Sequence, residues 1–239
     1  MITRIGDKFS YKFPLLRDFL KPLYHVLFYN RYYARRDKAF HKAAYEVLSL
    51  FDKCLTESNI KYSLAYGSML GAVREKGIIG HDSDLDTLIW ADEYDYMQVR
   101  NSLLKYGFKL TRCLVVNGGS LGREETYELH SVPIDIFYIY SPINKLPYTC
   151  SFIPKEGYPT MKISMEETGE IQARRGERPF GREMKRVPFG ELSLPIMKNA
   201  HEILESCYGK NYMIPDPTWK SDATVILWND VKATIESML

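Results

Sequence analysis

The stretch 61–90 constrains the fold more than any other part of the chain, because its hydrophobic period changes twice within thirty residues. Residues 61–66 alternate as a β-strand does, a Gly-Ser pair at 67–68 marks a tight turn, and residues 69–75 return to helical spacing. Residues 84–90 then predict a second strand. A strand, a turn, a helix and a strand in this order predict a sheet that is covered by helices.

Other segments continue this mixed order. Their periodicity predicts helices over 38–57, 93–106 and 196–208, and strands over 108–116, 123–130 and 134–140. Gly209 is expected to end the last of these helices. We therefore expect an α/β (α+β) fold with a mixed β-sheet core covered by helices. The proline- and arginine-rich residues 141–195 predict a loop-rich insertion or lid.

Composition limits the class of protein. The 239 residues, 45% hydrophobic and 26% charged, suit one large folded domain with appended segments. The sequence contains no stretch of about 18 uncharged apolar residues, the length that a membrane span needs, and its N-terminus lacks the pattern of a secretory signal. We therefore expect a cytoplasmic protein. The net charge of +2 argues against a nucleic-acid partner. Four cysteines stand too far apart for a zinc site and predict reduced thiols: Cys54, Cys113, Cys150 and Cys207.

The distribution of charge and motifs divides the chain into a basic amphipathic segment 1–40, a central domain 41–217 and a C-terminal helix 218–239. The first segment carries nine Lys or Arg against three Asp, interleaved with an apolar and aromatic series at helical spacing. Pro22 predicts two short helical pieces there. This segment either lies on the inner membrane surface or packs its apolar stripe on the protein body, and the sequence leaves both open.

Two aspartates on the second predicted strand indicate a metal site. Side chains alternate along a strand, so Asp84 and Asp86 project from one side while Leu85 faces the core. Neighbouring carboxylates repel each other unless a cation lies between them, and oxygen-only ligands favour Mg²⁺ or Mn²⁺. Asp135 stands alone in a later apolar strand and needs a partner, which the same metal would supply. Each aspartate taken alone also suits a surface or turn position.

The turn before these aspartates suits phosphate binding. Gly67 and Ser68 open a helix, Ser68 lies sixteen residues before Asp84, and backbone N–H groups at a helix start bind phosphate. A Gly-Ser turn, an Asp-x-Asp strand and a later lone aspartate resemble the nucleotidyltransferase superfold that includes DNA polymerase β. The full stretch 62–86 is similar to the signature of the LicD family, the bacterial relatives of fukutin and fukutin-related protein.

Two later segments extend this resemblance over about residues 40–217. Residues 134–137 resemble the family's third-aspartate strand, and residues 204–215 resemble its Tyr-Gly and proline-containing C-terminal element. The chain departs from the family at Gly80 and His81, where a proline and a tryptophan are usual, and at Ser83, where an acidic residue is usual. These departures bear on the substrate more than on the chemistry.

The resemblance implies a phosphotransferase. It would move a phospho-substituent, such as phosphocholine, ribitol phosphate or glycerol phosphate, from a CDP-linked donor to a hydroxyl of a cell-surface or lipid-linked glycan, as in lipopolysaccharide or capsule biosynthesis, and release CMP. Asp84, Asp86 and Asp135 would be the catalytic and metal-binding residues. The first two would hold Mg²⁺ (or Mn²⁺) against the diphosphate, and Asp135 would complete the site and accept the proton of the acceptor hydroxyl.

Four further residues are candidates for binding the donor. Gly67 and Ser68 would bind its phosphate, and Arg74 would either reach a phosphate or pair with an acidic strand residue. Arg182, in the cationic run 174–186, would clamp the donor or remain on a solvated surface. Two other functions stay open: a nucleotidyltransferase that modifies a small hydroxyl compound, and a catalytically inactive module that binds a nucleotide or a glycan.

Overall fold

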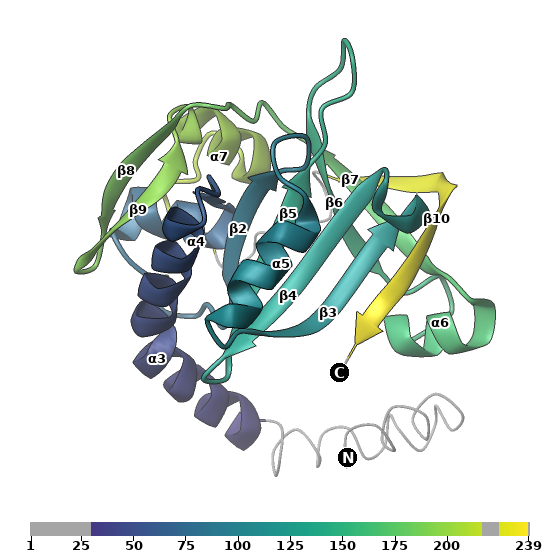
Figure 1. The fold of residues 1–239 in the computed structure, drawn as a ribbon, viewed down its shortest axis with the longest axis horizontal. Coiled ribbons are helices and arrows are strands. Elements are labelled where there is room, and N and C mark those ends of the chain that lie inside the picture. The colour runs from purple at the N-terminus through teal and green to yellow at the C-terminus, as the bar shows by residue number, and fades with distance from the viewer. Residues whose placement is uncertain (1–29, 217–224, 239) are drawn as a thin grey trace.

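The computed structural model describes residues 30–216 and 225–238, which form a mixed sheet with helices packed on it (Figure 1). From one edge to the other the sheet contains β1 (Ser63–Leu64), β2 (Leu85–Trp90), β5 (Val132–Ile139), β4 (Gly122–Leu129), β3 (Lys109–Val116), β10 (Ile226–Met238), β7 (Ile171–Glu177) and β6 (Tyr148–Ile153). A second sheet pairs β8 (Met184–Phe189) with β9 (Leu192–Met197). The predicted fold class, a mixed sheet covered by helices, is confirmed.

The helices of the described residues are α3 (Asn30–Glu57), α4 (Tyr66–Leu70), α5 (Tyr96–Lys105), α6 (Met161–Thr168) and α7 (Ala200–Tyr208). A π-helical turn over Gly71–Glu75 continues α4, and a short 3-10 turn over Asn117–Gly119 joins β3 to β4. A Cβ atom on Gly71 would lie 2.4 Å from the carbonyl oxygen of Gly77, so only glycine fits where the π-helical turn closes on the following loop.

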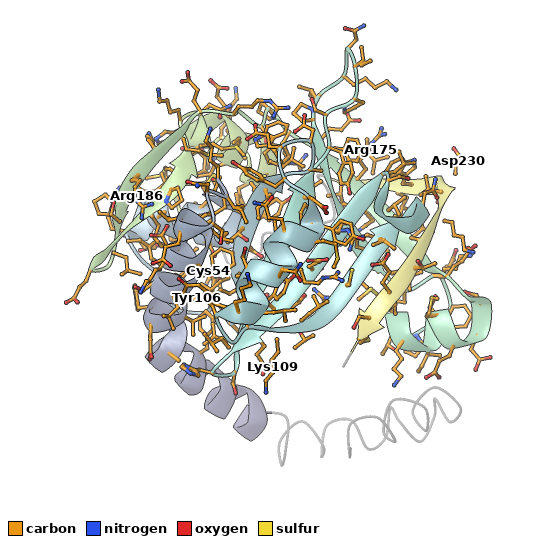
Figure 2. All side chains as sticks on the ribbon, in the orientation of Figure 1. Cys54, Tyr106, Lys109, Arg175, Arg186 and Asp230 are labelled. Atoms are coloured by element: carbon orange, nitrogen blue, oxygen red, sulfur yellow. The ribbon has the colours of Figure 1, made fainter. Side chains whose placement is uncertain are left out.

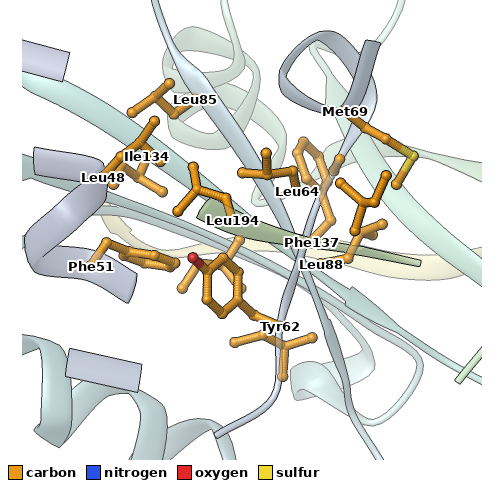
Figure 3. Close-up of a cluster of buried hydrophobic side chains, with 14 of the residues drawn as sticks. Leu48, Phe51, Tyr62, Leu64, Met69, Leu85, Leu88, Ile134, Phe137 and Leu194 are labelled. Atoms are coloured by element: carbon orange, nitrogen blue, oxygen red, sulfur yellow. The ribbon is translucent and has the colours of Figure 1, made fainter. Parts of the chain in front are cut away.

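The main core lies between the sheet and the helices α3 and α5, which cover one of its faces (Figure 1). The buried residues of α3 follow the predicted helical spacing: Phe40, Ala44, Val47, Leu48, Phe51, Cys54 and Leu55. They belong to the same buried cluster as Ile134 and Ile136 of β5, and Figure 3 shows part of this cluster. Because side chains alternate along a strand, Asp135 projects from the opposite face.

The sheet curls so that its edge strand β6 approaches β4 and β5. A Cβ atom on Gly122 of β4 would lie 2.4 Å from Cys150 Sγ of β6, so this glycine permits the close approach of the two strands. A second apolar cluster fills the inside of the curl: Leu114, Val116, Tyr148, Cys150, Phe152, Ile171, Ala173 and Ala233. All four cysteines are free, as predicted, and all four are buried.

The structure corrects the prediction of a loop-rich insertion over 141–195. This region contains β6, α6, β7, β8 and most of β9. Most of its prolines lie between these elements, whereas Pro188 and Pro195 lie within β8 and β9. Each strand of a two-stranded sheet has one edge without a partner strand, where the missing N–H of proline costs little.

The C-terminal segment also differs from its prediction. Residues 226–238 form the strand β10 rather than a helix, because they pair with β3 on one side and with β7 on the other. Ala233 is buried in the second cluster. Val231 and Ile235, two residues before and after it, are partly buried and pack against the same cluster. The helix predicted over 196–208 begins only at Ala200, since residues 196–197 complete β9, and it ends before Gly209 as predicted.

The predictions for most of the basic N-terminal segment lie outside the described residues. The structure begins with α3 at Asn30, so the choice between membrane contact and packing on the protein body stays open. None of the helices formed by the described part of the chain is both long enough and apolar enough to cross a membrane.

Candidate active site

One row of side chains crosses four adjacent strands. Asp86 of β2 is the Cα partner of Asp135 of β5, Asp135 is the partner of Thr126 of β4, and Thr126 is the partner of Arg112 of β3. Residues paired in register project from the same face of a sheet. The register therefore brings two of the three aspartates predicted to share a metal into neighbouring positions, together with an arginine.

The third aspartate, Asp84, is exposed at the approach to β2, and Asp82 lies half-buried just before it. Both aspartates act electrostatically on Asp86. A Cβ atom on Gly67 would lie 3.3 Å from Asp82 Oδ2 and 3.7 Å from Asp86 Oδ2. These two carboxylates thus lie against the glycine of the predicted phosphate-binding turn, and Asp82 joins the site although the sequence analysis gave it no role.

Burial and mutual repulsion disfavour the charged forms of these carboxylates. The pKa of Asp86 is raised well above its ordinary value, first by burial and then by the charges of Asp84, Asp135 and other carboxylates. Burial, with a contribution from Asp84, raises the pKa of Asp82 to about 6. The cluster is therefore a place where a cation would be strongly favoured.

The first turn of α4 is tied to the start of β2. The backbone N–H of Asp86 donates to Ser68 Oγ at 2.9 Å, and Ser68 is buried. Tyr66, just before the Gly-Ser pair, has a left-handed backbone with φ of +38°. Its hydroxyl shares a hydrogen bond of 2.5 Å with Thr149 of β6, and its ring packs edge-on against Phe137. These contacts hold a strained backbone at the turn that adjoins the aspartates.

Asp135 is 9% exposed and has two polar side-chain partners, one on the neighbouring strand β4 and one on the next strand, β3. Thr126 donates a hydrogen bond to its Oδ1, and the Arg112 guanidinium lies 3.5 Å from both of its carboxylate oxygens. Arg112 also donates to Glu124 at 2.7 Å. Burial, with repulsion from Asp135 as a second cause, raises the pKa of Glu124 to about 8, against the opposing effect of Arg112.

Arg74 lies near the cluster but is already engaged. Its guanidinium pairs with Glu75 at 2.8 Å and donates to the carbonyl of Tyr212 at 3.2 Å. It also lies close enough to Asp82 to lower the pKa of that carboxyl against the effect of burial. Tyr208, at the end of α7, lies near Asp86 and Asp82. Burial is the main cause of the raised pKa of its hydroxyl, and the charges of these two aspartates raise that pKa further.

The structure places Arg182 with a different set of partners. Its guanidinium pairs with Asp92 and Glu93, each at 2.6 Å, and stacks over the ring of Trp90 at 3.9 Å. These contacts tie the segment after β7 to the end of β2. Binding of a donor by Arg182 would require them to open.

The rest of the cationic run 174–186 does not form one surface. Arg178 is buried and donates to Cys207 Sγ, whereas Arg186 makes a two-pronged ion pair with Asp52 of α3. Arg175 and Arg186 lie on opposite sides of the molecule (Figure 2). Arg174 is the member that acts on the cluster, because it lowers the pKa of Glu124.

The donor set fits a hard divalent cation. Within residues 30–216 and 225–238, no three His, Cys, Asp or Glu side chains converge closely enough to hold a metal by themselves. Mg²⁺ in phosphoryl-transfer sites is usually bound by one or two carboxylates together with phosphate oxygens of the substrate. Asp84 and Asp86 would supply such carboxylates, and a bound cation would offset the repulsion that raises the pKa of Asp86.

Besides Asp82, three polar residues of this site were not predicted from the sequence: Arg112, Glu124 and Thr126. They lie on β3 and β4, away from any motif, and charged residues on predicted strands were the signal that could have indicated them. The register of the sheet shows which of them share a face with the aspartates.

Comparison with known proteins identifies relatives of this chain. An uncharacterized protein of Rickettsia prowazekii (strain Madrid E) is 30% identical over 117 residues, which are 48% of this chain and 40% of that protein. Another from Rickettsia typhi (strain ATCC VR-144 / Wilmington) is 35% identical over 82 residues, 34% of this chain and 26% of that protein. The matched segments thus span less than half of these relatives.

A family match covers the site itself. The family described as LicD/FKTN/FKRP, nucleotidyltransferase domain, matches residues 59–199, more than half of the chain. This range contains the Gly-Ser turn, the three predicted metal aspartates and the row from Asp86 to Arg112. The chain therefore belongs to the LicD family of nucleotidyltransferase domains.

Proposed function

We propose that this protein is a Mg²⁺- or Mn²⁺-dependent phosphotransferase that moves a phospho-substituent from a CDP-linked donor to a hydroxyl of a cell-surface or lipid-linked glycan and releases CMP. Membership of the LicD family supports a transferase. The observation that carries the proposal is the side-by-side placement of Asp86 and Asp135 on β2 and β5, with Asp84 in electrostatic reach. Its proposed place of action is the cytoplasm, at the inner membrane face if residues 1–40 bind lipid.

The aspartates have separate roles in this reaction. The acceptor oxygen attacks the phosphorus that carries the substituent, while the bond from that phosphorus to the bridging oxygen of CMP breaks. Asp84 and Asp86 would hold the divalent ion, which supplies charge neutralisation at the phosphoryl oxygens. Asp135 would complete the metal site, orient the acceptor hydroxyl and take its proton. The hydrogen bond from Thr126 holds one oxygen of Asp135 and so fixes the orientation of its carboxylate.

The first turn of α4 would bind the donor phosphate. Ser68 Oγ accepts the N–H of Asp86, and its own hydroxyl hydrogen donates to no acceptor among the described residues. That hydrogen is therefore available to a phosphate oxygen. Gly67 has no side chain to obstruct the approach, and its position against Asp82 and Asp86 would bring the phosphate close to the metal. Arg74 would add a positive charge near Asp82.

A panel of CDP-choline, CDP-ribitol, CDP-glycerol and CDP-ethanolamine tests the proposal. We expect one donor to raise the melting temperature and to release CMP with Mg²⁺ but not with EDTA. An acceptor that carries the nucleotide label would instead show nucleotidyl transfer. A donor that binds without turnover under every metal and acceptor condition would indicate an inactive binding module.

A further inference from the structure

A bulge in β3 determines which face of the sheet Arg112 occupies. Leu110 is the Cα partner of Tyr127, but Arg112 is the partner of Thr126, so Thr111 is an extra residue in the strand. The Thr111 hydroxyl donates to the Thr126 carbonyl at 3.1 Å and holds the bulge. In a regular strand Leu110 and Arg112 would share a face. The bulge separates them and places Arg112 on the face of the aspartates.

The guanidinium of Arg112 is held by acids on two strands. One nitrogen, Nη2, contacts Glu124 of β4 at 2.7 Å and both oxygens of Asp135 of β5 at 3.5 Å. The side chain is 29% exposed, so part of it is accessible to solvent and to a ligand. Its Nε atom is buried and has no hydrogen-bond partner among the described residues. Part of the hydrogen-bonding capacity of this arginine is thus unused.

The charge balance of the site calls for a cation that faces the donor. Four acidic side chains act electrostatically on Asp86: Asp82, Asp84, Glu124 and Asp135. A nucleoside diphosphate adds further negative charge, and a divalent ion on Asp84 and Asp86 would offset only part of it. An arginine fork matches phosphate oxygens in geometry as well as charge. The partners of Arg182 lie outside the cluster. Both acidic partners of Arg112 belong to it, and Arg112 stands in the row with Asp86 and Asp135.

We propose that Arg112, placed on the aspartate face by the bulge at Thr111 and held by Glu124, binds the diphosphate of the nucleotide donor. The inference rests on the proposed function, because it assigns a binding role within that site. In the free protein Arg112 is the counter-charge of Asp135. When donor and metal bind, the guanidinium turns its unused donors to the diphosphate, and Glu124 keeps it in place.

Binding of CDP and of inorganic pyrophosphate, each with Mg²⁺, tests this role. We expect Arg112→Gln to weaken both at least tenfold and to leave the binding of cytidine unchanged. Mn²⁺ alone should bind this variant as tightly as the wild type or more tightly, because a competing positive charge has left Asp135. Arg112→Lys should recover part of the affinity. Arg186→Gln, which removes an exposed arginine from its ion pair with Asp52, is the matched control and should bind both ligands normally.

The outcomes separate this inference from the proposed function. If folded Arg112→Gln binds CDP and pyrophosphate within twofold of the wild type, the inference is wrong and the proposed function stands. A variant with normal binding but reduced turnover would show that Arg112 only positions Asp135, and would also overturn it. If the wild type binds pyrophosphate through Arg112 but binds no CDP-linked compound, the phosphate site stands and the proposed donor is wrong. Should Arg112→Gln fail to fold, Arg112→Lys decides: unchanged affinity for both ligands overturns the inference, and a loss supports it.

Discussion

The hydroxyl of Ser68 accepts a hydrogen bond of 2.9 Å from the backbone N–H of Asp86, although the two residues stand eighteen positions apart in the chain. The bond joins the first turn of α4 to the start of β2. It fixes the predicted phosphate-binding turn relative to one of the predicted metal-binding carboxylates. The N–H of Ala65, just before α4, also donates to the Asp86 carbonyl at 2.9 Å, so two hydrogen bonds hold together parts of the site that were expected on separate grounds.

Ser68→Ala should lower the free energy of unfolding and also weaken the binding of the CDP-linked substrate. The change leaves the N–H of Asp86 without its acceptor, and an unsatisfied buried donor costs about 1–3 kcal/mol. Urea denaturation measures this loss. Ser120→Ala is the control, because Ser120 is exposed and its hydroxyl donates only to the nearby Asn117 carbonyl. Equal stability of the two variants would contradict the proposed importance of the Ser68 contact.

Asp86→Asn should abolish Mg²⁺-dependent turnover and raise the melting temperature in metal-free buffer. The raised pKa of Asp86 means that its charged form is disfavoured in the folded protein, and a neutral amide removes that penalty. Asp84→Asn should lose turnover with little change in melting temperature, since Asp84 is exposed.

The exposed Asp230, on β10 (Figure 2), offers the control for these variants. Asp230→Asn should keep both turnover and melting temperature. Retained activity in either Asp84→Asn or Asp86→Asn would remove the metal-site proposal. A lower metal-free melting temperature for Asp86→Asn would show that repulsion does not dominate at this position.

The stability of the metal-free protein should fall as pH rises from about 4.5 to 8, in part because of Glu124. Its pKa is raised from an ordinary 4.5 to about 8, so in this range the folded state holds a proton that the unfolded state has lost. Glu124→Gln removes this titration. Between pH 5 and pH 8 the wild type should lose at least about 1 kcal/mol more unfolding free energy than the variant, as urea titrations at each pH would measure. Parallel pH profiles would show that Glu124 does not hold this proton.

Glu125, the next residue on β4, should matter for stability and not for nucleotide binding. It is fully buried on the opposite face of the sheet, where it accepts hydrogen bonds from Arg100, Arg123 and Tyr127. Glu125→Ala leaves two arginines without this partner, and breaking a buried ion pair costs about 3–5 kcal/mol.

Glu128→Ala, on the exposed end of the same strand, is the control and should change the unfolding free energy by less than about 0.5 kcal/mol. CDP affinity, measured on the folded fraction at low temperature, should be unchanged in Glu125→Ala. A selective loss of CDP affinity would show that the two faces of β4 are coupled.

The basic N-terminal segment should attach the protein to anionic vesicles. Residues 1–40 carry six net positive charges, and each basic residue near an anionic surface contributes about 1 kcal/mol. A chain that begins at Arg36 lacks five of these six net charges and should no longer sediment with phosphatidylglycerol vesicles, and high salt should release the full-length protein. If the shortened chain instead melts far earlier, or the full-length protein ignores such vesicles at low salt, the segment packs on the protein body.

Local sequence was sufficient for the part of the chain that carries the signature. The change of period over 61–90, the Gly-Ser turn and the aspartates two residues apart all depend on neighbours in sequence, and each lies in the element predicted for it or beside it. The alternation of Ile134, Asp135 and Ile136 likewise predicted which of them would be buried in the core beneath the helices. Patterns of this kind are local, because the side-chain period of a strand or a helix is a property of its own backbone.

The pairing of strands that lie far apart in the chain could not be predicted from the sequence pattern. Residues 226–238 form a strand because they hydrogen-bond to both β3 and β7. Residues 148–197 contain further strands despite their prolines. A segment of mixed propensity takes the structure that its partners stabilise, and those partners lie far away in the chain.

The sequence by itself determined the family, the sheet-and-helix class and the identity of the three predicted metal-binding aspartates. Only the tertiary structure decided that Asp86 lies opposite Asp135, that Glu124 is buried beside them, and that a bulge at Thr111 places Arg112 on their face. The physical reason is that alternation relates the faces of residues within one strand, whereas register relates different strands. A single extra residue in a strand moves the following side chains to the other face of the sheet, and neither the composition nor a motif indicates it.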